Sequence, residues 1–211
     1  MSEVRYAILI DGDFMKRRLV AKHERFPEPN DVLSEIGRIR TRMTTKGLGF
    51  RLYRVFYYTA DPLNERRKNP LSGRVTNFAS TKQFRQNKTL IDALEQRDLM
   101  AIRRGELVFR GWALTSAVNE QLIGGKGKRI TASDLRPNIE QKGVDMRIGL
   151  DIASLAFKKI VTGVVIVTGD ADMVPALKLA RREGLSVYLD RMEMGGCREL
   201  CLHSDVVLDR A

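Results

Sequence analysis

Short apolar segments that end in aspartate are the feature that most constrains the fold of this chain. Residues 4–10 form an apolar run with one charged interruption, and Asp11 follows it directly. Residues 164–168 form a second strand of the buried type, and Asp170 and Asp172 come soon after it. Parallel strands end at one edge of their sheet, where α/β proteins place their active clefts. We therefore expect these acids to meet at that edge.

Strands and helices alternate along most of the chain, and this alternation predicts an α/β protein with three layers and a mainly parallel central sheet. The 211 residues are long enough for one well-formed core but short for two full domains. The expected strands are 4–10, 50–59, 164–168, 185–190 and 206–208, and the expected helices are 14–21, 30–44, 78–97, 144–158 and 173–183.

The middle of the chain follows the alternation least clearly. We expect two β segments within 99–115, joined at residues 104–106 around a glycine, and a flexible basic loop at 124–128. We therefore expect one domain over residues 1–211 that carries a basic insertion at about 61–136.

An excess of positive charge suggests a polyanionic partner. The chain has 37 Lys+Arg against 26 Asp+Glu, for a formal net charge of +11. Such a balance favours nucleic acid or an anionic surface, although each basic run is also explained as a solvated face. Phe78, Phe84 and Trp112 lie near basic residues and either stack unpaired bases or pack in the core. The candidate RNA-binding residues are Arg17, Arg18, Arg66, Arg67, Lys68, Arg103, Arg104, Lys126, Lys128 and Arg129.

Carboxylates gathered at the ends of apolar strands repel one another, and a divalent cation relieves that repulsion. Hard oxygen ligands favour Mg²⁺ or Mn²⁺ over zinc. Asp11 alone is equally well explained as a turn or helix-capping acid. Asp170 and Asp172 flank one small residue in a tight loop, and this is the most specific local signal, although Asp172 also suits a helix cap.

Helical geometry places Asp145 and Asp151 at the apolar stripe that begins at Val144. Asp145 is either a metal ligand or an acid that suits the helix N-terminus, and Asp151 either contacts a metal or pairs with a nearby arginine. Lys142 contacts a phosphate, balances the acids or is solvated. Thr168 offers its hydroxyl to the water shell of the metal or packs in its strand.

The remaining composition narrows the class of protein. No apolar run approaches the ~18 residues needed to span a bilayer, and no signal-peptide pattern opens the sequence. Two cysteines make no disulfide framework, so we expect a soluble cytoplasmic protein. Cys197, Cys201 and His203 have loosely zinc-like spacing without a fourth ligand, and we interpret them as packing residues.

Four of these segments together resemble the NYN family of PIN-like ribonucleases, particularly its bacterial LabA-like branch. The matching pieces are residues 8–12, Tyr57-Tyr58, 141–145 with Leu150-Asp151, and 167–175, in an order and spacing that agree from about residue 4 to 209.

The resemblance implies a PIN-like α/β/α domain that cleaves RNA with Mg²⁺ or Mn²⁺. It implies a metal role for Asp11, Asp145, Asp170 and Asp172, which are the candidate catalytic residues. Asp13 departs from the Asn that is frequent there, and Met173 from a common Phe. The supporting residues are Asp13, Lys142, Asp151 and Thr168.

Two other functions remain open. Asp11-Gly12-Asp13 after a first strand also resembles the nucleophile and acid/base pair of haloacid-dehalogenase-like phosphatases, although Met15 stands where Thr or Val is usual. A non-catalytic RNA-binding module would keep the acids for structure alone. Of the three functions, we expect the ribonuclease, which hydrolyses phosphodiester bonds in single-stranded RNA. Endo- versus exonuclease action, the identity of the RNA and formation of a homodimer stay open.

Overall fold

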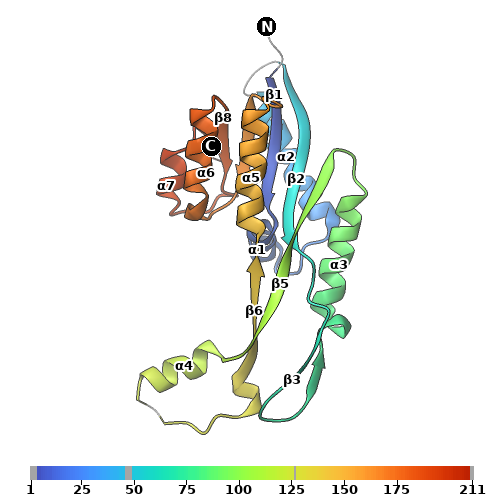
Figure 1. The fold of residues 1–211 in the computed structure, drawn as a ribbon, viewed down its shortest axis with the longest axis vertical. Helices are drawn as coiled ribbons and strands as arrows, with labels where there is room; N and C mark the ends of the chain where they lie inside the picture. Colours follow the sequence, from blue (N-terminus) through green and yellow to red (C-terminus); the bar gives the residue numbers. More distant parts are fainter. Residues whose placement is uncertain (1–3, 46–48, 126, 210–211) are drawn as a thin grey trace.

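A seven-stranded sheet lies at the centre of the computed structural model, which describes residues 4–45, 49–125 and 127–209 (Figure 1). Its strands are β1 (Val4–Asp11), β2 (Phe50–Ala60), β5 (Met100–Leu114), β6 (Leu135–Lys142), β7 (Gly163–Val167), β8 (Ser186–Asp190) and β9 (Val206–Val207). Their order is β6-β5-β2-β1-β7-β8-β9. The neighbours from β5 to β9 are parallel, and β6 alone runs antiparallel to β5.

Helices cover both faces of this sheet. They are α1 (Gly12–His23), α2 (Pro29–Thr45), α3 (Lys82–Glu95), α5 (Val144–Phe157), α6 (Val174–Arg182) and α7 (Arg198–Leu202). The helix α4 (Ser116–Ile123) lies away from these faces, at the bottom of Figure 1. Short 3₁₀ turns are η1 (Phe78–Ser80), η2 (Ala132–Asp134) and η3 (Ala171–Met173). In the part of the chain that the structure describes, none of these helices has the length and apolar character that crossing a membrane requires.

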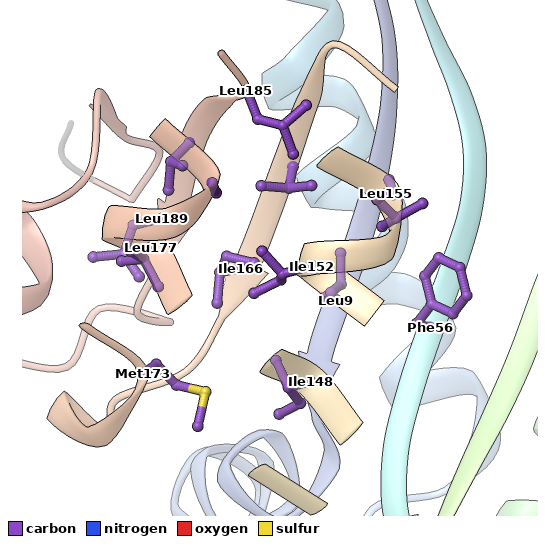
Figure 2. Close-up of a cluster of buried hydrophobic side chains, with 14 of the residues drawn as sticks. Leu9, Phe56, Ile148, Ile152, Leu155, Ile166, Met173, Leu177, Leu185 and Leu189 are labelled. Atoms are coloured by element: carbon purple, nitrogen blue, oxygen red, sulfur yellow. The ribbon is translucent and has the colours of Figure 1, made fainter. Parts of the chain in front are cut away.

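The alternation of side chains along β1 divides the core in two. Ile8 and Ile10 pack with the helices α1, α2 and α3. Leu9 faces the other way, into a cluster with α5 and α6 (Figure 2). Both sets of side chains are at most 1% exposed, as expected for strands covered on both faces. The predicted three-layer α/β fold is confirmed.

The strand β5 runs past the carboxyl edge of the parallel sheet. It pairs with β2 only as far as Gly105, which lies opposite Ala60. Beyond that point its partner is β6, which returns antiparallel and ends at Lys142, opposite Glu106. The chain therefore comes back to the carboxyl edge just before α5 begins. This return places Asp145, in the first turn of α5, at the end of the sheet that carries Asp11.

Residues 61–81, 106–125 and 127–142 form an arm that projects beyond the parallel strands of the sheet, at the bottom of Figure 1. A two-stranded antiparallel ribbon, β3 (Arg66–Lys68) and β4 (Val75–Asn77), lies in this arm. The Trp112 indole N–H donates to the Lys68 carbonyl at 3.0 Å, and the Asn69 side chain donates to the Ala132 carbonyl at 3.4 Å. These two bonds tie the ribbon to β5 and to the segment that leads into β6.

Two expectations for the middle of the chain were wrong. Residues 100–114 form one strand of 15 residues instead of two segments. Gly105 is a close contact instead of a turn, since a Cβ there would lie 2.6 Å from the Lys142 carbonyl oxygen. The helix expected over 78–97 is a 3₁₀ turn followed by α3, because the Thr81 hydroxyl caps α3 by accepting from the Phe84 N–H at 3.1 Å. The expectations also omitted β3, β4, β6, α4 and α7.

Gly12 sets how closely α1 approaches the sheet. A Cβ at this position would lie 2.5 Å from the Tyr58 carbonyl oxygen and 2.7 Å from the Tyr57 ring. The residue is buried and directly follows Asp11, so the approach also fixes where that carboxylate lies.

We expect Gly12→Ala to lower the free energy of unfolding by about 1–3 kcal/mol, because the added methyl overpacks a buried contact with backbone. Gly37→Ala is the matched control, since nothing lies within 4 Å of its Cβ position in α2. The control should be neutral or up to about 1 kcal/mol more stable, as for alanine replacing glycine within a helix. Urea unfolding of both variants measures the difference, and equal stabilities would contradict the packing role of Gly12.

Candidate active site

The carboxyl ends of the parallel strands bring two acidic segments together. Asp11 ends β1 and lies in register with Tyr58 of β2. On the other side of β1, Ile10 lies in register with Val167, the last residue of β7. The loop that carries Asp170 therefore leaves the sheet next to Asp11.

Asp11 is a buried carboxylate that caps α1. Its side chain is 9% exposed, and its Oδ1 accepts hydrogen bonds from the N–H groups of Asp13 and Phe14, each at 3.0 Å. Burial raises the pKa of Asp11, and the negative charges of Asp13 and Asp145 raise it further. The Phe14 N–H and the charge of Arg17 act in the opposite direction. The capping role and a site role are thus compatible.

Asp145 faces the other acids from the start of α5. Its side chain is largely exposed, yet partial desolvation raises its pKa, and the charges of Asp170 and Asp172 raise it further. The ionised form of Asp145 is therefore disfavoured by two acids that lie 25 and 27 residues away along the chain.

Asp170 and Asp172 are exposed on the short turn η3. The Asp170 carboxylate accepts from the Asp172 N–H at 2.9 Å, and the Asp170 N–H donates to the Thr168 hydroxyl at 3.1 Å. Thr168 is 1% exposed, so its hydroxyl holds the turn from within the protein. Thr168 is therefore packed inside the protein, and its hydroxyl also positions Asp170.

Four acids thus form one electrostatic group, which we call the acid cluster: Asp11, Asp145, Asp170 and Asp172. Within residues 4–45, 49–125 and 127–209, no set of three or more His, Cys, Asp or Glu side chains is arranged to hold a metal ion. Mg²⁺ is commonly held by only one or two carboxylates, with water and substrate phosphates completing its shell. The chemistry of the acid cluster fits such a hydrated cation, because each added positive charge would relieve the repulsion that raises the pKa values.

Asp151 lies apart from the acid cluster, in a network of its own. Its Oδ2 accepts from the Tyr58 hydroxyl and from the Arg103 Nε, each at 2.8 Å. The Arg103 guanidinium also lies over the Phe56 ring, 5.0 Å from its centroid. Of the two alternatives for Asp151, pairing with an arginine is the one that the contacts show. The network joins α5 to β2 and β5.

Asp13 and Lys142, the other predicted supporting residues, each pair with a neighbour. The Lys16 Nζ lies 2.5 Å from the Asp13 carboxylate and donates to the Asn87 Oδ1 at 3.0 Å, which links α1 to α3. Lys142 is exposed, and its Nζ lies 3.6 Å from the Glu140 carboxylate. Lys142 thus ends β6 as an exposed cation beside Glu140, and its contact with a phosphate stays a prediction.

A cavity of about 610 Å³ opens beside Asp13. It lies between α1, α3 and the facing strands β5 and β6. Its lining consists of Asp13, Lys16, Arg17, Val20, Ala21, Phe26, Ala60, Pro62, Leu63, Phe78, Thr81, Gln83, Phe84, Asn87, Leu107, Ile139 and Gln141.

The candidate RNA-binding arginines near the sheet differ in their exposure and in whether they pair with other groups of the protein. Arg17 is exposed at the cavity. Arg18 donates from Nε and Nη2 to the Met192 carbonyl, at 3.1 and 2.8 Å. Arg103 and Arg104 point to opposite faces of β5, because Arg104 pairs with Glu95 of α3 at 2.9 Å. These two therefore do not form one basic patch.

The other candidates lie in the arm. Arg66 and Arg129 are exposed, and Arg67 lies over the Phe109 ring, 5.0 Å from its centroid. The Lys128 Nζ donates to the Asp134 carboxylate at 2.6 Å. Lys126 lies outside the described residues, and so does part of the predicted flexible loop. Lys68 is exposed on β3, so the arm presents cations from both of its segments.

Asp190 is a buried acid that the sequence analysis did not single out. It ends β8 at the same edge of the sheet, is 0% exposed, and accepts from the Arg42 Nη1 at 2.8 Å. The sequence could have indicated Asp190 in the same way as Asp11, because it stands at the end of a predicted apolar strand. Cys197 is buried in the cluster formed with α5 and α6, and Cys201 packs against that cluster.

The comparisons with known proteins give one family and one fold. The model of the NYN domain matches residues 5–201. A crystal structure of a Vibrio parahaemolyticus protein of unknown function is similar in fold, with a TM-score of 0.51 and 13% sequence identity, over 98% of this chain and 94% of that chain. No curated protein matches this chain significantly.

Asp134 lies at the far end of the arm, directly before β6 begins, and its titration should be visible in stability. Bonds from Lys128 and Thr131 lower its pKa to about 2. A lowered folded-state pKa adds stability that is present above the ordinary value of about 4 and is lost as the pH falls toward the folded-state value. We expect Asp134→Asn to unfold more easily than wild type at pH 7, with a difference that disappears near pH 2.

Thermal unfolding at pH 7, 4 and 2 measures this difference. Asp92→Asn is the control, because Asp92 is an exposed acid whose partner is Lys88 in the same helix. A deficit of Asp134→Asn that is the same at all three pH values would contradict the electrostatic role.

Proposed function

Since the chain belongs to the NYN domain family, a family of PIN-like nucleases, we propose that it is a metal-dependent ribonuclease of the bacterial LabA-like branch. Its substrate in this proposal is single-stranded RNA, whose phosphodiester bonds it hydrolyses with Mg²⁺ or Mn²⁺. We take residues 1–211 as one functional domain acting in the cytoplasm, with the arm as its substrate-facing insertion. The homodimer stays a prediction.

The observation that carries this proposal is the electrostatic coupling within the acid cluster. Asp145 is brought to the carboxyl edge by the return of β6, and its pKa responds to Asp170 and Asp172 from the loop after β7. Asp11 responds to Asp145 from the end of β1. Three segments far apart in sequence thus contribute acids to one edge of the sheet, where a polyanionic substrate would otherwise be repelled.

In the proposed site, one or two carboxylates of the set Asp11, Asp145, Asp170 and Asp172 would hold a hydrated cation, and the other acids would stabilise its charge from nearby. A bound Mg²⁺ or Mn²⁺ would supply an activated water and neutralise charge on the phosphoryl oxygens. The chain itself supplies positioning. Asp11 is fixed by two backbone N–H groups, and Asp170 is fixed by the buried Thr168 hydroxyl. Asp151 holds α5 against β2 through Tyr58 and β5 through Arg103, and so acts as a positioning residue.

Exposed cations near this edge and in the arm are suited to the phosphate backbone of the RNA. Arg17 lies at the cavity beside Asp13, while Arg66 and Arg129 lie farther out on the arm. Membership in the NYN family favours the ribonuclease over the phosphatase, whose small substrate leaves these cations without a role. A non-catalytic RNA-binding module remains the outcome to which failure of cleavage would point.

We expect Asp170→Asn/Asp172→Asn to lower the rate of metal-dependent RNA cleavage by about 100-fold or more, because even residues that only support metal ligands contribute about 10–100-fold. Cleavage of end-labelled single-stranded RNA with Mg²⁺ or Mn²⁺, with chelator as a parallel reaction, measures the rate. Asp92→Asn serves as the carboxylate control and should cleave at the wild-type rate. Intact RNA in every reaction of folded wild-type protein would sink the nuclease and leave the binding module.

The arm should contribute to RNA affinity through salt-dependent binding to phosphates. We expect Arg66→Ala/Arg129→Ala to reduce the slope of log affinity against log salt by about 0.7 for each phosphate of a single strand that the variant no longer neutralises. Arg182→Ala is the control, since Arg182 is exposed at the end of α6 and pairs with Glu183. Fluorescence anisotropy with labelled RNA in chelator, from low to high salt, gives the slopes. Equal slopes for the double variant and wild type would remove the arm from the RNA-binding surface.

A further inference from the structure

The cavity beside the acid cluster has the size of a binding site for a small organic group. Its volume of about 610 Å³ lies within the range of about 300–1,000 Å³ that is usual for such sites. Asp13 belongs to its lining, and Asp13 donates its N–H to the Asp11 carboxylate. Whatever enters the cavity is therefore held directly beside the proposed site of cleavage.

Aromatic and aliphatic side chains make up much of the cavity wall. Phe84 is half-buried on α3, Phe78 is 9% exposed on η1, and Phe26 is half-buried in the loop before α2. Leu107 of β5 and Ile139 of β6 close the other side. Flat apolar walls of this kind suit a planar ring, since stacking on aromatic side chains is how proteins hold unpaired bases.

Gln141 belongs to the lining of the cavity and has an unpaired polar atom. Its Oε1 is buried and accepts no hydrogen bond from any residue that the structure describes. A buried acceptor left in this state destabilises the protein, and rotation of the Gln141 side chain toward a ligand N–H in the cavity would remove that cost. Each of the four common RNA bases carries an N–H on its Watson–Crick edge. Gln83 and Asn87 add further amide groups to the same lining.

Two cations, Lys16 and Arg17, belong to the lining of the cavity and could bind the phosphate of a nucleotide. Lys16 links the Asp13 carboxylate on α1 to the Asn87 side chain on α3, and Arg17 is exposed beside it. The charge of Arg17 also lowers the pKa of Asp11, so the cationic part of the lining reaches the acid cluster. The lining therefore combines apolar walls, a residue with an unpaired acceptor, and cations on the helix that begins at the acid cluster.

We propose that this cavity binds one unpaired nucleobase of the RNA and thereby sets which phosphodiester bond reaches the acid cluster. The inference rests on the proposed ribonuclease for the source of the base, while the pocket itself is tested without cleavage. Base capture explains the apolar walls, the free acceptor and the cations together, whereas phosphate binding alone would leave the walls and the acceptor without a role.

The first experiment is an amide NMR titration of the whole protein in chelator. The probes are the four nucleoside 5′-monophosphates and ribose 5-phosphate, which has the same phosphate without a base. We expect at least one nucleotide to bind about tenfold more tightly than ribose 5-phosphate, as one stacked base implies. Its shifts should centre on the cavity and include the side-chain amide of Gln141. Equal affinities, or shifts centred elsewhere, would overturn the proposal.

Two variants with a matched control locate the binding. Ile139→Trp fills the cavity from β6 and should abolish the advantage of the nucleotide over ribose 5-phosphate. Asn138→Trp places the same ring one residue away on the same strand, where the residue is exposed and does not line the cavity, and should keep that advantage. Gln141→Leu should weaken nucleotide binding several-fold while raising resistance to urea, because it removes the unpaired acceptor. Loss of nucleotide binding in Asn138→Trp alone would contradict the assignment.

Cleavage assays on the same proteins separate the two hypotheses. Base-dependent binding in a protein that leaves RNA intact supports the pocket and refutes the nuclease. Metal-dependent cleavage with no preference for nucleotides over ribose 5-phosphate refutes the pocket and retains the nuclease. A single-stranded RNA of about eight nucleotides, within the site sizes usual for such proteins, is compared with an abasic strand of equal length to show whether the base is taken from a chain. Binding of free nucleotides with equal affinity for both strands would overturn the RNA assignment.

Discussion

The antiparallel pairing of β6 with the projecting part of β5 is the constraint on which the acidic edge depends. The parallel strands alone bring Asp11 and Asp170 together, because β1 and β7 are neighbours. Asp145 lies on a helix that follows an excursion of the chain into the arm. Only the register of β6, which ends opposite Glu106, returns the chain to the same edge. The arm is therefore part of the architecture of the site as well as a surface for substrate.

Burial and charge act against each other at this edge. Asp11 is enclosed by the close approach of α1, which Gly12 permits, and its ionised form is disfavoured by burial. Two backbone N–H groups offset part of that cost. Asp190 also accepts a backbone N–H, from Met192 at 2.8 Å, and in addition pairs with Arg42 of α2. The two buried strand-end acids therefore differ in their partners. Asp190 pairs with an arginine inside the fold, whereas Asp11 faces the further acids Asp13 and Asp145.

Sequence reasoning predicted well those features that depend on neighbouring residues. Buried strands appear as apolar runs, and the acids at their ends follow from the direction of parallel strands. The nature of Gly105 could not be seen, because its close partner, Lys142, is distant along the chain. The strand β6 was missed since its residues alternate without a clear apolar face and are mostly exposed. The partners of Asp151, Tyr58 and Arg103, could not be predicted because they are distant along the chain. The cavity could not be predicted either, because its lining comes from α1, α3, β5 and β6.

The central position of β1 also governs when the protein can fold. Its two neighbours in the sheet are β2 and β7, and β7 begins at Gly163. The face of β1 that carries Leu9 is covered by α5 and α6, which come equally late in the chain. Contacts over such separations form slowly, because a long loop must close before they can form. During synthesis, the face of β1 that carries Leu9 therefore stays exposed until more than three quarters of the 211 residues have been made. A ribosome-bound intermediate of this protein would be a client for chaperones until β7 emerges.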